Sequence, residues 1–143
     1  MLANKEENSR PQVEAMIAAG LPVHVSFPCT VDESLAYLHS LCALLGVDAA
    51  SSPPVEACRA AAERAAVSTV EAVPVFVPIW KDPWMTFDEG AYASDILRVC
   101  GGANVFASRM RQYPLAADLG RREPWSRERV AERDTRYPRI RLE

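Results

Sequence analysis

Apolar residues in this chain follow two different spacings. Short, nearly continuous apolar runs, which are typical of buried strands, occur at 2–4, 22–27 and 73–79. The longer stretches between and after them carry apolar residues three or four positions apart, a spacing that predicts helices over 10–19, 31–45, 54–67 and 91–99. Because strands joined through helices usually pair in parallel, we expect an α/β fold with short parallel sheets.

The expected helix ends carry recognisable signals. Ser9 and Thr30 are each followed three residues later by Gln or Glu, the spacing of a capping box that bonds the free N–H groups of a first turn. Gly20 and Gly46 follow the first two helices, and glycine favours the left-handed conformation in which many helices end. Element boundaries are therefore predicted from polar signals as well as from apolar spacing.

The four cysteines and one of the two histidines raise the question of metal or nucleophile chemistry. None of the cysteines forms a C-x-x-C pair, which argues against a zinc site. Cys42 and Cys58 lie among apolar residues on expected helices, which predicts buried thiols. Cys100 falls at a helix C-terminus, where the dipole disfavours a thiolate, so we interpret it as a packing residue. His24 lies in an apolar strand as either a metal ligand or a hydrogen-bonded, partly buried side chain.

Charge is unevenly distributed along the 143 residues. The net charge is −3 and the sequence pI is about 5.5, so no nucleic-acid partner is expected. Ten of the sixteen basic residues are arginines from Arg109 onward. Acidic residues are interleaved with them, so we interpret this region as a solvated surface with one short polar helix within 121–134. No catalytic constellation or phosphate-binding glycine loop is evident, which predicts a protein that is not an enzyme.

An aromatic loop follows the third expected strand. Two prolines of that strand, Pro74 and Pro78, cannot donate to a ladder, so we expect them at its ends or on a sheet edge. Ligands of open α/β sheets bind beyond the carboxyl ends of strands, and tryptophan offers a wide apolar face with one N–H donor. The loop therefore predicts a ligand surface, formed by Trp80, Asp82, Pro83, Trp84 and Phe87. The alternative is that Trp80 or Trp84 caps the core.

Taken together, these segments resemble the substrate-binding proteins of cobalamin and siderophore ABC transporters, which have two α/β lobes joined by a helical backbone. Residues 1–29 resemble the end of the first lobe, 30–72 a helical connector, and 73–143 part of the second lobe. The most specific string is Cys-Gly-Gly-x-Asn-x-Phe at 100–106. The Tyr-Pro pairs at 113–114 and 137–138 resemble the Tyr/Trp-Pro segment that follows it, with 116–136 as an insertion.

The resemblance implies binding without catalysis and without a required cofactor. In the family, the ligand lies in the cleft between the lobes, held mainly by aromatic and apolar contacts. The implied second-lobe contacts are the five residues of the aromatic loop, and the implied first-lobe contacts are Asn4, Lys5 and Phe27. The implied ligand is cobalamin or a related corrinoid. An iron–siderophore or haem is the alternative.

Family members also present an acidic residue on each lobe to arginines of the membrane permease. The residues implied for this docking are Glu6 or Glu7 on the first lobe, and Asp88 or Glu89 before the second-lobe helix. The alternative is that each is an ordinary surface carboxylate. An ABC transporter permease is the implied protein partner.

The resemblance covers nearly the whole chain, but the chain corresponds to only about half of a family member. The family implies a periplasmic or membrane-associated extracellular location, whereas the N-terminus has no signal-peptide pattern, which predicts a cytoplasmic chain as written. Missing neighbours would leave sheet edges exposed, so we expect self-association. A further hypothesis is therefore a shortened cytosolic fragment that acts only as an interaction protein.

Overall fold

A strand–helix–strand unit forms the N-terminal part of the computed structural model, which describes residues 1–66 and 71–141. Strand β1 (Leu2–Asn4) leads into helix α1 (Arg10–Ala18), and the chain returns as β2 (His24–Ser26). The two strands pair in parallel with Ala3 opposite Val25. The expected connection through a helix is therefore present, although Ser9 forms no side-chain cap bond to α1.

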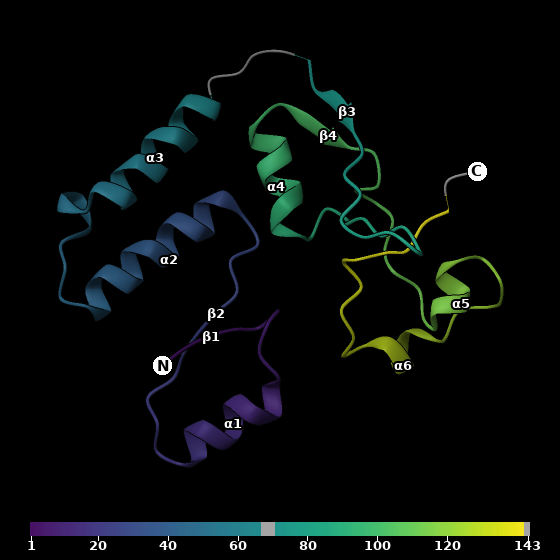
Figure 1. Cartoon of the computed structure of the whole chain (residues 1–143), viewed down its shortest axis with the longest axis horizontal. Helices are drawn as coiled ribbons and strands as arrows, with labels where there is room; N and C mark the ends of the chain where they lie inside the picture. The colour runs from purple at the N-terminus through teal and green to yellow at the C-terminus, as the bar shows by residue number, and fades with distance from the viewer. Residues whose placement is uncertain (67–70, 142–143) are drawn as a thin grey trace.

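Two long helices form the connector. Helix α2 (Val31–Leu44) is capped by Thr30, whose side chain accepts the backbone N–H of Glu33 at 3.1 Å, as the sequence predicts. A 3₁₀ turn (Ala49–Ser51) then leads into α3 (Pro53–Ala66), and α3 packs beside α2 (Figure 1). The predicted end of the third helix at Val67 lies outside the described residues.

The second parallel sheet pairs β3 (Val73–Val75) with β4 (Gly102–Asn104), joined through α4 (Tyr92–Val99). The predicted strand over 73–79 is too long, because only its first three residues pair with β4. The backbone N–H of Val73 donates to the carbonyl of Gly101 at 2.9 Å. Because backbone groups alternate in direction along a strand, the backbone nitrogen of Pro74, the next residue, points away from β4. The described sheet has no strand on that side, and the proline therefore costs no ladder bond, as expected for an edge.

The core of the second lobe forms where two distant segments meet. Residues 84–88 run beside 136–140, with hydrogen bonds from Thr86 N–H to Pro138 O at 3.1 Å and from Ile140 N–H to Trp84 O at 2.9 Å. Thr86 and Pro138 are among the most completely buried side chains in the described chain. The Tyr-Pro segment at 137–138 is therefore an integral part of the lobe.

The arginine-rich region contains two short helices. Helix α6 (Arg127–Val130) is the short polar helix predicted within 121–134. Helix α5 (Leu115–Asp118) was not predicted, since four residues show no periodicity. It ends before Gly120, which has a φ of +69°, and its Asp118 is buried. Both helices lie at one end of the molecule, to the right in Figure 1.

The packing of several predicted core residues differs from expectation. Cys42 is buried as predicted, but Cys58 and Cys100 are both exposed, so the prediction that they pack in the interior is wrong. The reason is local: α3 and α4 each present one face to a shared groove that remains open to solvent. Leu45 lies beyond the end of α2 and is 76% exposed.

Candidate functional site

The aromatic loop forms a tight hairpin at the surface of the second lobe. Trp80 and Met85 face each other as an antiparallel bridge, closed by a hydrogen bond from Met85 N–H to Trp80 O at 3.0 Å. Asp82 adopts a φ of +60° in the turn, a conformation that Asp tolerates better than most residues. Trp80 is 65% exposed, so it does not cap the core in the described structure.

The remaining loop residues are less accessible than Trp80. Trp84 and Pro83 are half-buried, and the Lys81 ammonium lies 5.7 Å from the centre of the Trp84 ring. Phe87 is only 2% exposed, and its carbonyl accepts the side-chain amide of Asn104 at 2.9 Å. Phe87 is therefore a core residue in this structure, and the surface of the loop consists of the tryptophans with Asp82.

Asp88, one of the predicted docking acids, lies in the interior. Its side chain is 5% exposed and accepts the backbone N–H of Gly90 at 2.9 Å. Burial raises the pKa of this carboxyl above its ordinary value, although the Gly90 N–H and the Arg136 charge oppose the shift. Glu89, the next residue, is exposed and remains free for the predicted role at the surface.

The first-lobe candidates gather in the turn after β1. The Asn4 side chain accepts the backbone N–H of Glu6 at 2.7 Å, so it stabilises its own turn. The Lys5 ammonium lies 5.4 Å from the centre of the Phe27 ring, and both residues are exposed. Asn4 and Lys5 also line a cavity of about 500 Å³ between the first sheet and α1. Glu7 is exposed at the same turn.

Arg136 joins the two lobes, a role that was not predicted from the sequence. Its guanidinium lies 2.6 Å from a carboxylate oxygen of Glu6 and 2.6 Å from one of Asp134. It also lies 4.6 Å from the centre of the Phe27 ring. Glu6 additionally accepts the Tyr137 hydroxyl at 2.9 Å, across 131 positions of sequence. We call Glu6, Phe27, Arg136 and Tyr137 the lobe junction.

The lobe junction is partly buried, and its ionisation reflects this. Burial and the bond to Glu6 raise the pKa of Tyr137 to about 12, so the hydroxyl remains a donor at neutral pH. Burial opposes ionisation of Asp134, but the hydrogen bonds and charge of Arg136 outweigh it and lower the Asp134 pKa. Asp134 is therefore held as a carboxylate beside the Arg136 guanidinium, next to the lobe junction.

A signal for the junction was present in the sequence but incomplete. Arg136 directly precedes the Tyr137-Pro138 pair that the family resemblance singles out. Its partner Glu6 carries no local indication of this contact, because only folding brings the two segments together. The structure thus places Phe27 and Glu6 opposite Arg136 and Tyr137, whereas the described contacts of Trp80 and Trp84 lie within the second lobe.

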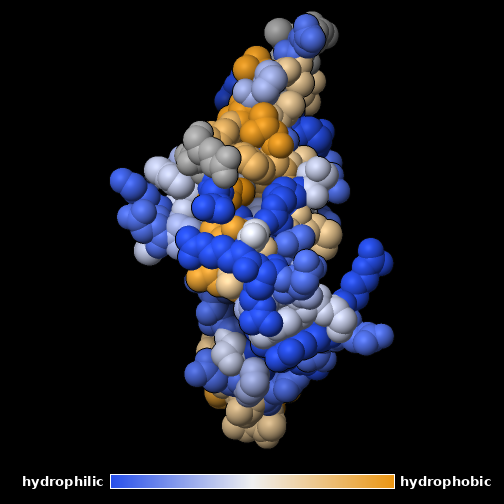
Figure 2. Space-filling view, turned by 90° about the vertical axis from the view of Figure 1, so that its right-hand side faces the viewer, coloured by the Kyte–Doolittle hydropathy of each residue, from blue (hydrophilic) through white to orange (hydrophobic). Residues whose placement is uncertain are grey.

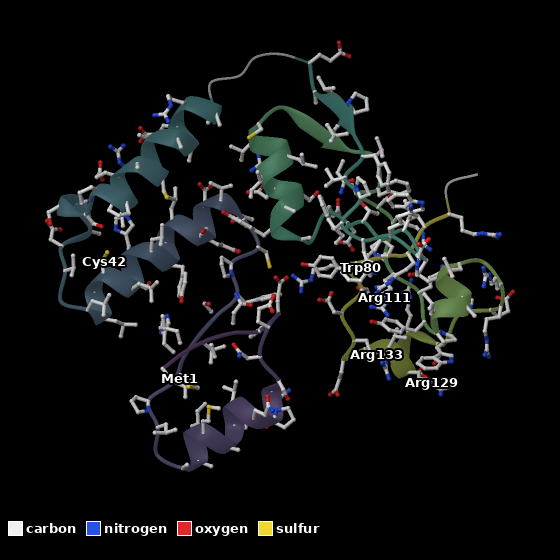
Figure 3. The ribbon with its side chains drawn as sticks, viewed as in Figure 1. Met1, Cys42, Trp80, Arg111, Arg129 and Arg133 are labelled. Carbon is white, nitrogen blue, oxygen red and sulfur yellow. The ribbon has the colours of Figure 1, made fainter. Side chains whose placement is uncertain are left out.

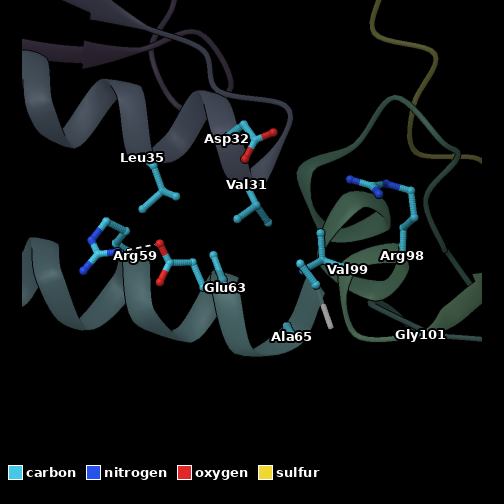
Figure 4. A pocket seen from close by; sticks show the side chains of 11 residues that line it. Val31, Asp32, Leu35, Arg59, Glu63, Ala65, Arg98, Val99 and Gly101 are labelled. Carbon is cyan, nitrogen blue, oxygen red and sulfur yellow. Dashed lines mark hydrogen bonds and ion pairs between the residues drawn. The ribbon is translucent and has the colours of Figure 1, made fainter. Parts of the chain in front are cut away.

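A further cavity of about 570 Å³ lies between α2, α3 and the end of α4 (Figure 4). Arg59 pairs with Glu63 along its wall, and Asp32 and Arg98 line the opposite side. None of the predicted ligand-binding or docking residues lines it. Within residues 1–66 and 71–141, no group of three or more His, Cys, Asp or Glu side chains is arranged to hold a metal ion.

The same described part of the chain contains no helix that is both long and apolar enough to cross a membrane. No protein-family model and no curated protein sequence matches the chain. Among solved structures, the chain is similar to the periplasmic vitamin B12 binding protein BtuF of Vibrio cholerae, with a TM-score of 0.64 and 20% sequence identity. The match covers 90% of this chain and 48% of that protein, so this chain spans about half its length.

The likeness establishes the fold. This chain has part of the α/β fold of that vitamin B12 binding protein, with two short parallel sheets and a helical connector. The resemblance inferred from the sequence is thereby confirmed at the level of fold. The division at residues 29 and 72 and the proposed ligand contacts stay predictions.

Proposed function

We propose that this chain acts as the substrate-binding part of an ABC importer and captures cobalamin or a related corrinoid between its two lobes. The observation that carries the proposal is the fold match to a vitamin B12 binding protein over 90% of the chain. The lobe junction supports it, because a cleft ligand needs two lobes held in a defined relation. The proposed role is capture and release without catalysis.

A corrinoid suits the side chains that these surfaces present. A corrin is a broad, flat, amide-fringed disc, so it needs wide apolar contact and a few hydrogen-bond donors. Exposed Trp80 supplies both, and half-buried Trp84 and Pro83 extend the same surface. On the first lobe, Lys5 offers an ammonium donor, and Phe27 offers the part of its ring that Lys5 and Arg136 leave exposed. We keep Asp82 and Asn4 as polar contacts and leave Phe87 out because it is buried.

Two exposed acids are the best candidates for contact with a permease. Glu7 lies on the first lobe and Glu89 on the second, and both are accessible. Glu6 is engaged by Arg136 and Tyr137, and Asp88 is buried, so neither is free to pair with an arginine of a partner. This role places the working protein outside the cytoplasm.

Equilibrium dialysis against cyanocobalamin, with haem as competitor, tests the proposal. We expect saturable retention of the corrinoid by the folded chain, measured from its visible absorbance. Trp80→Ala should weaken binding about tenfold, because a wide aromatic contact is lost from an exposed position. Trp84→Ala should also weaken it, while Ile96→Ala, which truncates an exposed apolar residue on α4, should leave retention unchanged.

Other outcomes decide between the alternatives. Preferential retention of haem, or of an iron–siderophore tested in its place, would assign a different ligand to the same fold. A folded sample that retains none of these ligands would overturn capture by this chain and favour a non-transporting fragment with a role in protein interaction.

A further inference from the structure

Two aromatic rings near α6 are covered by three arginines. Tyr113 and Trp125 stack with their ring centres 6.3 Å apart and an angle of 16° between their planes. The Arg111 guanidinium lies 4.4 Å from the centre of the Tyr113 ring, and that of Arg129 lies 3.9 Å from the centre of the Trp125 ring. Arg133 contacts both rings, at 5.1 and 5.4 Å. We call these five residues the arginine stack.

The backbone holds the arginine stack together. Trp125 N–H donates to Tyr113 O at 2.7 Å, and Arg111 N–H donates to Thr135 O at 2.7 Å. The Tyr113 hydroxyl donates to the backbone carbonyl of Asp134 at 2.7 Å. Figure 3 places Arg111, Arg129 and Arg133 together on the side of the molecule that carries α6, far from Met1 and Cys42. The stack is therefore a local structure of the region 109–136.

The guanidiniums of the stack are not used in ion pairs within the described chain. Each ion pair found in residues 1–66 and 71–141 involves arginines other than Arg111, Arg129 and Arg133. The Arg111 Nε is buried without a hydrogen-bond partner in the same part of the structure. Burial and the nearby charge of Arg111 also lower the pKa of Arg139. Positive charge is thus concentrated here without full compensation.

The net charge of the region around the arginine stack is also positive. Ten arginines and five acidic residues lie between Arg109 and Arg141, a formal charge of +5 in a chain of net charge −3. Two of those acids, Asp118 and Asp134, already pair with Arg109 and Arg136. Figure 2 faces this side of the molecule and shows a largely hydrophilic surface around α5 and α6.

Aromatic stacking prepares these arginines to bind carboxylates. A guanidinium held against a ring has already lost much of its rotational freedom, and the ring removes water from one of its faces. Its N–H edge remains available for two parallel hydrogen bonds to a carboxylate. Arg129 and Arg133 also line an open hollow with Glu128 and Glu132, so an acidic segment meets two like charges there and its attraction comes from the arginines.

We propose that the arginine stack is a docking surface for an acidic segment of a partner protein, rich in Asp and Glu. The geometry of stacked arginines with free edges and the local charge of +5 support this occupant. The arginine stack shares no residue with the lobe junction or the aromatic loop, and the proposal does not depend on the ligand of the cleft.

Fluorescence anisotropy of a labelled oligoglutamate peptide tests this proposal on the whole chain. We expect binding that weakens steeply with added salt and is absent for a matched oligoglutamine peptide. The double variant Arg129→Gln/Arg133→Gln should weaken binding at least about tenfold, because two charge-assisted contacts are lost. The control Arg10→Gln/Arg64→Gln makes the same change in net charge on exposed arginines elsewhere and should bind as the unchanged chain does.

A conservative variant separates docking from folding. Arg129→Lys/Arg133→Lys keeps both charges but loses the planar fork, so binding should fall to an intermediate level while circular dichroism stays unchanged. Equal losses in both Gln double variants would overturn the proposal by showing only general charge attraction. Absence of peptide binding would also overturn it. So would displacement of the labelled peptide by inorganic phosphate or by anionic vesicles at a lower concentration of negative charge than unlabelled oligoglutamate needs.

Discussion

At the residue scale, Arg136 shows how one side chain acquires a role that its local sequence does not specify. It lies between Glu6 of the first lobe and Asp134 of its own lobe, with the Phe27 ring against it. Charge-assisted bonds in a partly buried position are worth more than exposed pairs, and removal of one partner leaves the others uncompensated. Arg136 is therefore expected to contribute more to stability than any exposed arginine.

Replacement of this arginine tests that expectation. Arg136→Met should lower the free energy of unfolding by roughly 1–2 kcal/mol, measured by urea denaturation, because Glu6 and Asp134 lose their shared partner. Arg10→Met removes an exposed pair with Glu14 and should change stability little. Equal effects of the two variants would contradict a special role for the junction.

Asp88 gives a second residue-scale prediction, based on pH. Burial raises its folded-state pKa, so the folded chain binds more protons than the unfolded chain between the two pKa values, and stability falls as pH rises from about 4. Asp88→Asn should be more stable than the unchanged chain near pH 7. This advantage should disappear at about pH 3, where the Asp88 carboxyl of the unchanged chain is protonated. Urea denaturation at both pH values measures this.

The exposed neighbour supplies the control for Asp88. Glu89→Gln should change the free energy of unfolding little at either pH, because its side chain lies in solvent. An Asp88→Asn variant that is less stable than the unchanged chain at neutral pH would show that the carboxylate contributes favourably, in contradiction to the argument from burial.

At the scale of elements, the two predicted helix caps show that a capping signal in the sequence does not always form its hydrogen bond in the structure. The capping boxes at Ser9 and Thr30 have the same spacing, yet only Thr30 accepts a backbone N–H with its side chain. In β3, Pro74 is tolerated because its position faces away from β4. Local sequence signals therefore predicted where the elements lie, while the packing of each element against the rest of the fold determined whether a predicted contact forms.

The two caps form a matched pair of variants. Thr30→Ala should lower the free energy of unfolding by about 1 kcal/mol, because the Glu33 N–H loses its acceptor at the start of α2. Ser9→Ala should have a much smaller effect, since its side chain makes no cap bond. Chemical denaturation of both variants measures the difference, and a larger loss for Ser9→Ala would contradict the described cap geometry.

At the scale of the whole molecule, apolar surface remains uncovered near the first sheet. Exposed leucines from β1 and the end of α2 line an open groove of about 550 Å³, together with Met1 and Pro22. Exposed groups of this kind favour association with another surface. The described first sheet also has only two strands, which leaves backbone edges available for pairing.

We therefore expect this chain to self-associate through that groove. Leu45→Glu should shift light scattering and sedimentation toward the monomer at fixed protein concentration, because it places charge in the apolar groove. Leu115→Glu alters an exposed leucine on α5 and should leave the association unchanged. A stable monomer of the unchanged chain at high concentration would contradict this prediction.

The sequence by itself determined the α/β class, the order of strands and helices as far as α4, and the family resemblance, because each rests on spacing and short motifs within neighbouring residues. Strand β4 and helix α5 were not predicted, since each is too short to show a period. Only the tertiary structure decided that Phe87 and Asp88 are buried while Trp80 is exposed, since these positions depend on the pairing of 84–88 with 136–140. It also brought Glu6 to Arg136 and assembled the arginine stack. Such contacts join residues far apart in the chain, so the spacing of neighbouring residues does not predict them.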